Sequence, residues 1–460
     1  MKSILLLSLA ALSQTGAALS LHERSQPATL GYAIERKSSN VNSRRKRDTS
    51  SVTINSANDL DLYSFNFTLG TPGQPISVGL DTGSSDLWMN AVNSTYCSGL
   101  HESKCDTSDK FDPSKSDSYK VLNHGFKIQY GDSTGAEGDY ATDTLKFGNV
   151  TLDEFQFAVG YVTSTELGIM GIGYESLEAV DQTRTAGPEY KNLPQALVKA
   201  GYIKSPAYSL WLDDLESRKG QILFGGVNTA KYSGELHTLP IIKEHGDYLE
   251  FLVNMTGLSF SNGTKETSYS KGFPTPVLLD SGTTLSYLPD DAVEDILNDV
   301  GTYDFMLQTY TVDCDMRSTG YNLTFEFPGF SMTVDIAEMI LEAENGICIF
   351  GIDYQGKETA VLGDTFLRSA YVVYDLGNNE ISMAPANFDP GEDNILEIGT
   401  GSSAVPTATG APTGTGTSTA ATATGTSGAS ETSEGAAMPM MTASPKLMAG
   451  LAGAGLLLAL

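Results

Sequence analysis

The sequence predicts an all-β fold with few short helices, built as two homologous lobes that face each other across a cleft. Three observations support this fold class. Between residues 48 and 394 the chain shows short alternating or β-branched runs, such as 65–69 and 371–374, punctuated by Gly and Asn. Helical periodicity is sparse. Two segments of the region repeat each other, which indicates a duplicated lobe.

Two segments carry a helical pattern. In residues 290–300 the apolar positions recur on one face and Gly301 follows, and residues 194–200 end similarly before Gly201. With 460 residues and a hydrophobic fraction of 40%, the chain can fill two cores and still carry appended segments. We place the first lobe at 48–240 and the second lobe at 241–395.

The N-terminus has the layout of a secretory signal peptide. Lys2 precedes an apolar run at residues 4–12, and small residues follow at 16–18, so we expect residues 1–18 to be removed. Four consecutive basic residues at 44–47 stand just before the first strand pattern. Such a run suits a kexin-type processing protease, which predicts a propeptide at 19–47 that is cleaved after Arg47.

The charge balance is strongly acidic. The whole chain has a formal charge of −28, and removal of residues 1–47 takes away eight Lys/Arg and two Asp/Glu, which leaves −34. We therefore expect no nucleic-acid partner. Crowded carboxylates repel one another at neutral pH, which predicts best stability and activity on the acidic side, although solubility alone also explains such a charge.

Four cysteines in an oxidising compartment predict disulfide bonds. Spacing alone allows three pairings; we favour Cys97 with Cys105 and Cys314 with Cys348. Metal ligation is the competing interpretation, but no CxxC pair is present and the five His residues are scattered, so we expect neither a metal nor a cofactor. The sequons that predict N-glycosylation are at Asn66, Asn93, Asn149, Asn254, Asn262 and Asn322.

The end of the chain predicts a surface anchor. From about Gly399 the composition becomes Ser, Thr, Gly, Ala and Pro with almost no charge, typical of an O-glycosylated stalk, which we place at 396–435. An apolar end at 447–460 follows, as in a glycosylphosphatidylinositol (GPI) signal, here 436–460, with attachment at Gly435 or within 427–430. Fourteen apolar residues are too few to span about 30 Å of hydrocarbon.

The internal repeat concerns two acidic turns. Residues 78–85 read VGLDTGSS and residues 277–284 read VLLDSGTT. A hydrophobic-hydrophobic-Gly element follows each turn, with Gly171 lying 90 residues after Asp81 and Gly363 lying 83 residues after Asp280. Two similar turns, each followed along the chain by a similar strand, imply two lobes that face each other.

These turns are suited to acid–base chemistry. Each apolar strand delivers an Asp onto a tight turn at Gly83 or Gly282, and two such turns at a pseudo-dyad bring Asp81 and Asp280 within hydrogen-bond range. Like charges that close cannot both ionise, so the pair shares one proton. The ionised carboxylate can then take a proton from water while the protonated one polarises a carbonyl group.

Four hydroxyl side chains support the pair in this interpretation. Ser84 and Thr283, each three residues after its Asp, can donate to the outer carboxylate oxygens, and Thr82 and Ser281 can tie the two turns together. A single Asp-Thr-Gly segment usually forms an ordinary turn. Two copies at equivalent positions of an internal repeat instead indicate a functional pair.

Over about residues 55–390 the sequence resembles the pepsin family of aspartic proteases. Residues 81–88, DTGSSDLW, and 361–368, VLGDTFLR, carry the resemblance. Together with the processing site, stalk and anchor signal, they make the chain most similar to the fungal GPI-anchored yapsins and to candidapepsin-like secreted proteases. The resemblance implies the bilobal pepsin-like acid protease fold and a monomeric aspartic endopeptidase at the cell surface or wall, acting on proteins and peptides.

The resemblance also implies a flap hairpin over the cleft. Residues 128–132, IQYGD, match it, with Tyr130 as the flap tyrosine, Gly131 at the mobile tip and Trp88 as the hydrogen-bond partner of Tyr130. Asp132 stands where family members that accept Lys or Arg at P1, the residue before the cut bond, often carry an acid. We expect a basic P1 preference; a cap on the flap turn is the equally supported alternative.

Two other classes of protein share part of this pattern. A glycoside hydrolase also uses two carboxylates, but it needs no matching Thr/Ser-Gly turns in two lobes. A catalytically dead binding module is disfavoured because both Asp residues, Ser84, Thr283 and Tyr130 are all present. The sequence therefore favours an active endopeptidase.

Overall fold

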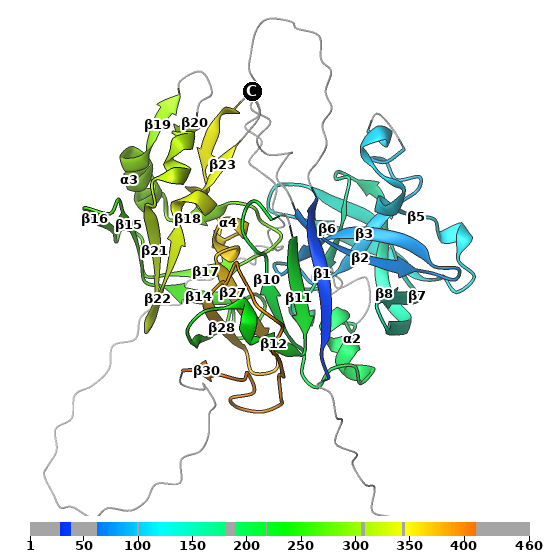
Figure 1. The fold of residues 1–460 in the computed structure, drawn as a ribbon. Helices are drawn as coiled ribbons and strands as arrows, with labels where there is room; N and C mark the ends of the chain where they lie inside the picture. Colours follow the sequence, from blue (N-terminus) through cyan, green and yellow to red (C-terminus); the bar gives the residue numbers. More distant parts are fainter. Residues whose placement is uncertain are drawn as a thin grey trace, which may run out of the picture.

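β-Strands dominate the computed structural model, as the alternating sequence pattern predicts. The structure describes residues 28–37, 62–98, 101–179, 189–217, 219–304, 309–342 and 346–410. Figure 1 shows two lobes side by side, the N-terminal one in blue and cyan and the C-terminal one in yellow-green. The predicted all-β, two-lobed fold class is confirmed.

The N-terminal lobe contributes nine strands to a 15-stranded sheet. Its path runs β1-β2-β3-β9-β4-β8-β7-β6, and β5 pairs with β4. The strands are β1 (Leu30–Lys37), β2 (Leu62–Leu69), β3 (Gln74–Asp81), β4 (Leu87–Ala91), β5 (Lys110–Phe111), β6 (Lys120–Gln129), β7 (Gly135–Phe147), β8 (Val150–Thr163) and β9 (Gly168–Gly171).

The same sheet continues between the lobes in the order β30-β13-β28-β27-β10-β11, and β11 pairs with β1. These strands are β10 (Ala207–Trp211), β11 (Lys219–Phe224), β13 (Leu236–Pro240), β27 (Ala370–Asp375), β28 (Glu380–Pro385) and β30 (Ala408–Thr409). Strand β1 belongs to the predicted propeptide, yet it lies between β11 and β2 in the middle of this sheet. The segment is thus an integral part of the fold described here.

Three smaller sheets build the C-terminal lobe, in the orders β14-β17-β26-β18-β25, β16-β15-β21-β22 and β19-β20-β24-β23. The first contains β14 (Leu252–Met255), β17 (Thr275–Leu279), β18 (Ser286–Leu288), β25 (Ile352–Tyr354) and β26 (Ala360–Leu362). The others contain β15 (Gly257–Ser261), β16 (Glu266–Tyr269), β19 (Gly301–Asp304), β20 (Thr309–Val312), β21 (Asn322–Phe327), β22 (Phe330–Asp335), β23 (Ile340–Glu342) and β24 (Cys348–Phe350).

The two helical predictions are confirmed. Helix α3 (Asp290–Val300) buries the predicted apolar face and ends before Gly301, and α2 (Leu193–Lys199) covers the shorter segment. Helix α4 (Asp364–Leu367) directly follows Gly363 and was not predicted. It is one turn long, which is too short to give a periodic signal.

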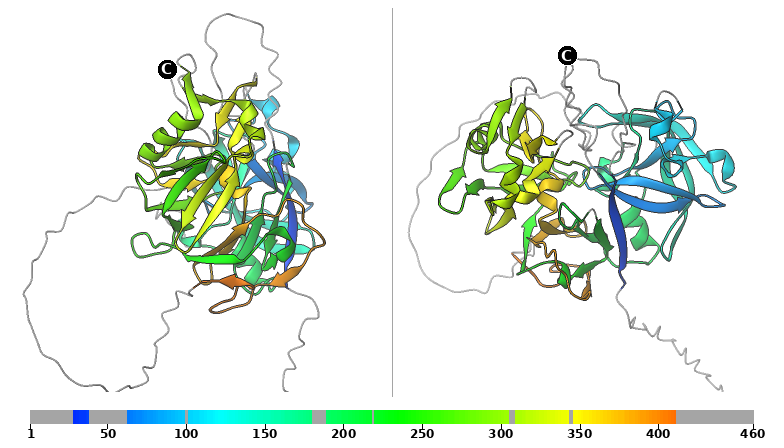
Figure 2. Two further views of the ribbon diagram at one scale, coloured as in Figure 1. Left: turned by 60° about the vertical axis from the view of Figure 1, so that its left-hand side comes forward. Right: turned by 45° about the horizontal axis from the view of Figure 1, so that its top comes forward.

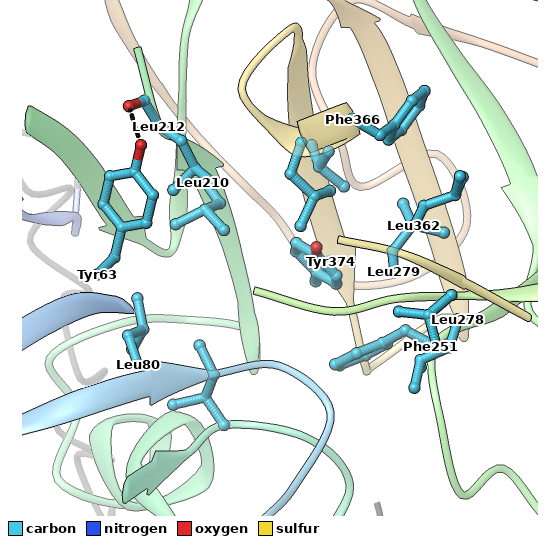
Figure 3. Packing of buried hydrophobic residues seen from close by; sticks show 14 of the residues in the cluster. Tyr63, Leu80, Leu210, Leu212, Phe251, Leu278, Leu279, Leu362, Phe366 and Tyr374 are labelled. Atoms are coloured by element: carbon cyan, nitrogen blue, oxygen red, sulfur yellow. Dashed lines mark hydrogen bonds between the residues drawn. The ribbon is translucent and has the colours of Figure 1, made fainter. Parts of the chain in front are cut away.

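A continuous apolar core underlies both acidic turns. Figure 3 shows Leu80 from β3 on one side and Leu278 and Leu279 from β17 on the other, with Tyr374 of β27 between them. Leu80 and Leu279, the residues that directly precede the two Asp residues, are fully buried. Their side chains fix the ends of β3 and β17, because a packed core leaves little freedom for the strand that enters it.

The C-terminal boundary of the folded part lies later than predicted. We placed the stalk at 396–435, but β29 (Ile395–Glu397) pairs with β12 (Gly226–Asn228) and β30 pairs with β13. Ile398 and Val405 are buried against the interlobe sheet. This orange segment runs along the lower side of the molecule in Figures 1 and 2. Scattered apolar residues in a Gly/Ser-rich stretch gave no periodic signal.

Several predictions concern residues that the structure does not describe. The signal peptide, the cleavage site at Arg47, the GPI signal and its attachment residue Gly435 all lie outside the described ranges. Across the described ranges, no helix is long and apolar enough to cross a membrane.

Candidate active site

Two equivalent strand ends position the acidic turns. β3 ends at Asp81 and pairs in parallel with β9, whose Gly171 faces Asp81; β17 ends at Leu279, just before Asp280, and pairs in parallel with β26. The Ile172 amide donates to the Asp81 carbonyl at 3.0 Å, and the Asp280 amide donates to the Leu362 carbonyl at 3.1 Å. The repeat seen in the sequence is therefore a repeat of backbone structure.

Within each turn the carboxylate is held in the same way. The amides of Gly83 and Gly282 donate to Oδ1 of Asp81 and Asp280, each at 2.8 Å. Thr283 Oγ1 donates to Asp280 Oδ2 at 2.5 Å, and Ser84 Oγ donates to Asp81 Oδ2. The predicted hydroxyl contacts are all present in the structure.

The two carboxyl groups meet at the junction of the lobes and hydrogen-bond to each other. A Cβ atom added at Gly83 would lie 2.7 Å from Oδ1 of Asp280, and one added at Gly282 would collide with Oδ1 of Asp81. Any larger residue at either glycine would displace the carboxyl group of the opposite lobe. Glycine is required here by close approach.

Four further hydrogen bonds cross between the turns. Thr82 Oγ1 donates to the Leu279 carbonyl at 2.9 Å and accepts from the Ser281 amide at 2.9 Å. Ser281 Oγ donates to the Leu80 carbonyl at 3.0 Å and accepts from the Thr82 amide at 3.3 Å. All of these groups are buried, so the bonds lock the two lobes in register at the acidic pair.

Burial raises the pKa of both acidic side chains, which are fully shielded from solvent. The pKa of Asp280 lies well above its usual range because the charge of Asp81 adds to the cost of burial. The pair therefore keeps a proton on Asp280 under conditions where an exposed Asp is ionised. One protonated and one ionised carboxyl group can polarise a carbonyl and deprotonate a water molecule together.

The flap tyrosine closes over this pair. Tyr130 directly follows β6, is 4% exposed, and accepts a hydrogen bond from Nε1 of Trp88 at 2.7 Å, as predicted. Burial, followed by the nearby charge of Asp81, raises the pKa of Tyr130 well above its usual value. Gly131 is exposed at the turn. The phenol is thus a neutral group between the flap and the acidic pair.

Only one carboxylate oxygen of Asp132 caps the flap turn. Oδ1 accepts from the Thr134 amide at 2.9 Å and from Thr134 Oγ1 at 2.6 Å, which is the capping role considered from the sequence. Oδ2 is buried and has no hydrogen-bond partner in the described part of the chain. Burial, followed by the charges of Asp353 and Asp132, raises the pKa of Tyr287 in β18 to about 12.

A buried acidic cluster beside Trp88 was missed by sequence reasoning. Asp86 accepts from Tyr190 Oη at 2.7 Å, Tyr140 Oη at 3.2 Å and the Ala179 amide at 2.7 Å. Glu178 Oε2 accepts from the Tyr190 amide at 2.9 Å, and burial raises the pKa of Glu178 to about 10. Asp86 lies inside the DTGSSDLW segment, so its position gave a signal; Glu178 gave none.

Glu250 is a second acidic group that the sequence did not single out. It precedes β14, is 8% exposed, and has a pKa raised to about 8 by burial and by the charges of Glu244 and Asp81. A third carboxyl group therefore lies within electrostatic range of the acidic pair.

The remaining predicted residues lie away from the acidic pair. The structure joins Cys97 to Cys105 and Cys314 to Cys348, the two local pairs. None of the six sequon asparagines is buried. Among the described residues, no group of three or more His, Cys, Asp or Glu side chains is arranged to hold a metal ion.

The fold and the paired turns define the class of this protein. Residues 62–386 match the family described as eukaryotic aspartyl protease, and the chain belongs to that family. It is an aspartic-type endopeptidase with the pepsin-like fold and is similar to the yapsins.

Named relatives agree with this assignment. A probable aspartic-type endopeptidase opsB of Aspergillus oryzae is 49% identical over 89% of this chain and 86% of the relative. The aspartic proteinase yapsin-3 of Saccharomyces cerevisiae is 37% identical over 78% of this chain and 72% of its own length. The aspartic proteinase MKC7 of the same yeast is 35% identical over 80% and 72%, respectively.

Proposed function

We propose that Asp81 and Asp280 are the catalytic pair of this endopeptidase. Ionised Asp81 takes a proton from a water molecule, protonated Asp280 donates to the carbonyl oxygen of the scissile peptide bond, and the water oxygen adds to the carbonyl carbon. The resulting diol collapses as the leaving amine takes up a proton. The observation that supports this assignment best is the mutual hydrogen bond of two buried carboxyl groups.

Hydrolysis of casein at acidic pH, with and without a statine-type inhibitor, tests this proposal. Wild type should be active and fully inhibited, because the inhibitor's hydroxyl group imitates the diol. Activity that persists in the inhibitor or in Asp81→Asn would contradict the assignment.

A basic P1 preference is the second part of the proposal. The unpartnered Oδ2 of Asp132 offers a buried carboxylate oxygen to a Lys or Arg side chain, and a charge of −34 for the processed chain favours cationic peptides at modest salt. Burial raises the pKa of Asp132. A cation that binds there would be matched best at the upper end of the enzyme's acidic range.

The substitution Asp132→Asn tests the charge of residue 132 separately from its role as a cap of the flap turn. The Asn side chain keeps an oxygen for Thr134 and removes the negative charge, so Lys and Arg at P1 should lose their advantage while the flap turn stays formed. Asp117→Asn, an exposed acid on the same lobe, is the matched control. Unchanged P1 selection by both Asp132→Asn and Asp132→Ala would defeat the idea.

We also propose that the enzyme is exported, processed after Arg47 by a kexin-type protease and held at the outer cell surface by a GPI lipid attached at or near Gly435. The signal-like N-terminus, the basic run and the apolar C-terminus support this route. A phosphatidylinositol-specific phospholipase C should release the enzyme from intact cells. Enzyme that stays cell-bound after the lipase would indicate attachment to the wall, and enzyme found entirely in the medium would oppose anchoring.

A further inference from the structure

Asp86 lies on the short segment that joins the first acidic turn to β4. Its carbonyl accepts a hydrogen bond from the Gly171 amide at 2.9 Å, and the Asp81 carbonyl accepts one from the Ile172 amide at 3.0 Å. Two consecutive residues at the end of β9 therefore hold both ends of the segment 81–86. The position of Asp86 thus affects the acidic turn on one side and Trp88 on the other.

The side chain of Asp86 accepts hydrogen bonds from three separate parts of the lobe. It is fully buried, and its Oδ1 accepts from the hydroxyl groups of Tyr190 and Tyr140, while Oδ2 accepts from the Ala179 amide. Tyr140 lies on β7, the second strand of the flap hairpin, whereas Ala179 and Tyr190 lie between β9 and α2. A carboxyl group has two oxygens for these three donors, and an amide side chain has only one. Asp86 therefore joins the flap hairpin to the segment before α2.

A row of ring contacts connects this carboxyl group to Trp88. Tyr190 packs edge-on against Tyr140, with ring centroids 6.0 Å apart. Tyr140 packs edge-on against Phe126 of β6 at 5.2 Å, and Phe126 packs against Trp88 at 6.4 Å. Together with Tyr130, these rings belong to a buried cluster that is separate from the main core. Because close-packed rings leave little room for movement, the position of Tyr190 helps to fix the position of the indole.

The indole is the last step before the flap. Trp88 donates through Nε1 to Tyr130 Oη at 2.7 Å. Ser84 hydrogen-bonds to Tyr130 as well and donates to the carboxyl group of Asp81. Hydrogen bonds weaken steeply with misalignment, so the closed position of Tyr130 depends on where the indole N–H points. The indole has a single polar atom, and its orientation therefore depends on the rings packed around it.

Glu178 holds Tyr190 from the other side. Its Oε2 accepts from the Tyr190 amide at 2.9 Å, and its side chain is fully buried. Burial, assisted by the charge of Asp86, raises the pKa of Glu178 to about 10, so this acid is neutral over the whole acidic range. Tyr190 is thus bonded through its amide to one buried acid and through its phenol group to the other.

We propose that Asp86 and Tyr190 are positioning residues for the reaction, which hold the indole of Trp88 where it can bind Tyr130 over the acidic pair. Both act through the flap and not on the reacting atoms. A small displacement of the indole is enough to matter, because a shift of about 1 Å in a group that orients the substrate can cost about a hundredfold in rate. This inference rests on the proposed catalytic role of the acidic pair.

The test compares Tyr190→Phe in two backgrounds, the wild type and Tyr130→Phe. In the wild type, loss of the phenol oxygen should lower kcat/KM about fivefold, because the ring cluster loses its bond to Asp86. In Tyr130→Phe, which has no flap oxygen for Trp88 to bind, the same substitution should lower kcat/KM less than about 1.5-fold. Asp86→Asn should show the same dependence on background, because its amide nitrogen would face the donor of Ala179 or of a tyrosine.

Tyr371→Phe is the matched control for a purely structural loss. Tyr371 of β27 is a buried tyrosine of a different cluster, and its hydroxyl group donates to Ser209 Oγ and accepts from the Asn228 amide, each at 2.7 Å. Its removal should lower Tm at least as much as Tyr190→Phe does. It should leave kcat/KM within about 1.5-fold in both backgrounds.

The outcomes separate a positioning role from a structural one. A lower Tm of Tyr190→Phe with unchanged kcat/KM, or an equal loss of kcat/KM in the two backgrounds, would overturn the proposal, because either result means that Tyr190 does not act through the flap. An error in the assignment of the acidic pair would appear independently, as activity that survives Asp81→Asn.

Discussion

The two acidic turns are nearly the same structure in different surroundings. In both, a glycine amide donates to Oδ1 at 2.8 Å and a hydroxyl group three residues after the Asp donates to Oδ2. The N-terminal turn, however, lies beneath Tyr130 of the flap, whereas the C-terminal turn lies opposite the hairpin of Glu250. Burial raises the pKa of both acids, and the charge of Asp81 raises that of Asp280 as well.

The features that the two turns share come from duplication of the lobe, and the features that differ between them come from later divergence. Duplication gives two carboxyl groups with matched backbone support, which is enough to share a proton. Divergence places Tyr130 of the flap near the acidic pair from one lobe and an additional acid, Glu250, near it from the other. Variants of matched residues in the two lobes can therefore test symmetry and asymmetry separately.

The largest expected effect concerns the symmetric pair itself. Asp81→Asn and Asp280→Asn should each lower kcat by at least about a thousandfold, because neither Asn can take part in sharing a proton between the two side chains. Both variants should keep the native fold, since Asn preserves the acceptor for the glycine amide at position 83 or 282. Steady-state kinetics with circular dichroism checks this. A variant with more than about a tenth of wild-type activity would contradict the assignment.

The crossing hydroxyl groups provide a second test of symmetry. Thr82→Val and Ser281→Ala should each lower the free energy of unfolding by about 1–3 kcal/mol, because each leaves buried backbone groups without a partner. Thr82→Val should cost more, since the bonds of Thr82 Oγ1 are both 2.9 Å, whereas Ser281 Oγ accepts at 3.3 Å. Urea unfolding measures both.

The double variant Thr82→Val/Ser281→Ala shows whether the two hydroxyl groups stabilise the turns together or independently. Because the two hydroxyl groups bind the same two turns, their effects should not add, whereas Thr302→Val on exposed β19 should be nearly neutral and additive with either. Full additivity of Thr82→Val and Ser281→Ala would mean that the turns are supported independently.

The flap is the main asymmetry, and Tyr130→Phe tests it. Loss of the phenol oxygen leaves the indole N–H of Trp88 buried without its partner, so the flap should close less often and kcat/KM should fall about tenfold. Tyr287→Phe in the C-terminal lobe is the matched control and should change kcat/KM less than about twofold. Equal effects of the two substitutions would show that the flap bond has no special role.

The symmetric part of the site was predictable from sequence, and the asymmetric part largely was not. Asp81, Asp280 and their flanking hydroxyl groups stand in a local motif whose spacing fixes the geometry. Glu250 and Glu178 depend on which distant strands and turns pack together, as with the Tyr190 amide on Glu178, and no local pattern encodes that. The β-rich class followed from alternation, but β1 and β30 pair with strands far away in the chain.

The asymmetry extends to stability, where the acidic cluster beside Trp88 should make the N-terminal lobe sensitive to alkali. The pKa of Glu178 is raised from 4.5 to about 10 by burial, so the folded state holds a proton that the unfolded chain releases above about pH 4.5. Stability from this group is therefore complete below that pH and is lost as pH rises toward 10. Glu178→Gln removes the ionisable group while keeping an acceptor for the Tyr190 amide.

Thermal unfolding of Glu178→Gln at two pH values tests this expectation. The variant should match wild type at pH 3.5 and exceed its Tm by a few degrees at pH 7, because only the wild type must then bury an acid that would otherwise ionise. Glu189→Gln, an exposed acid next to Tyr190, removes the same charge and should leave the pH dependence unchanged. If both variants gained equally at pH 7, general charge repulsion in this acidic chain would explain the alkaline sensitivity, and the buried position of Glu178 would not.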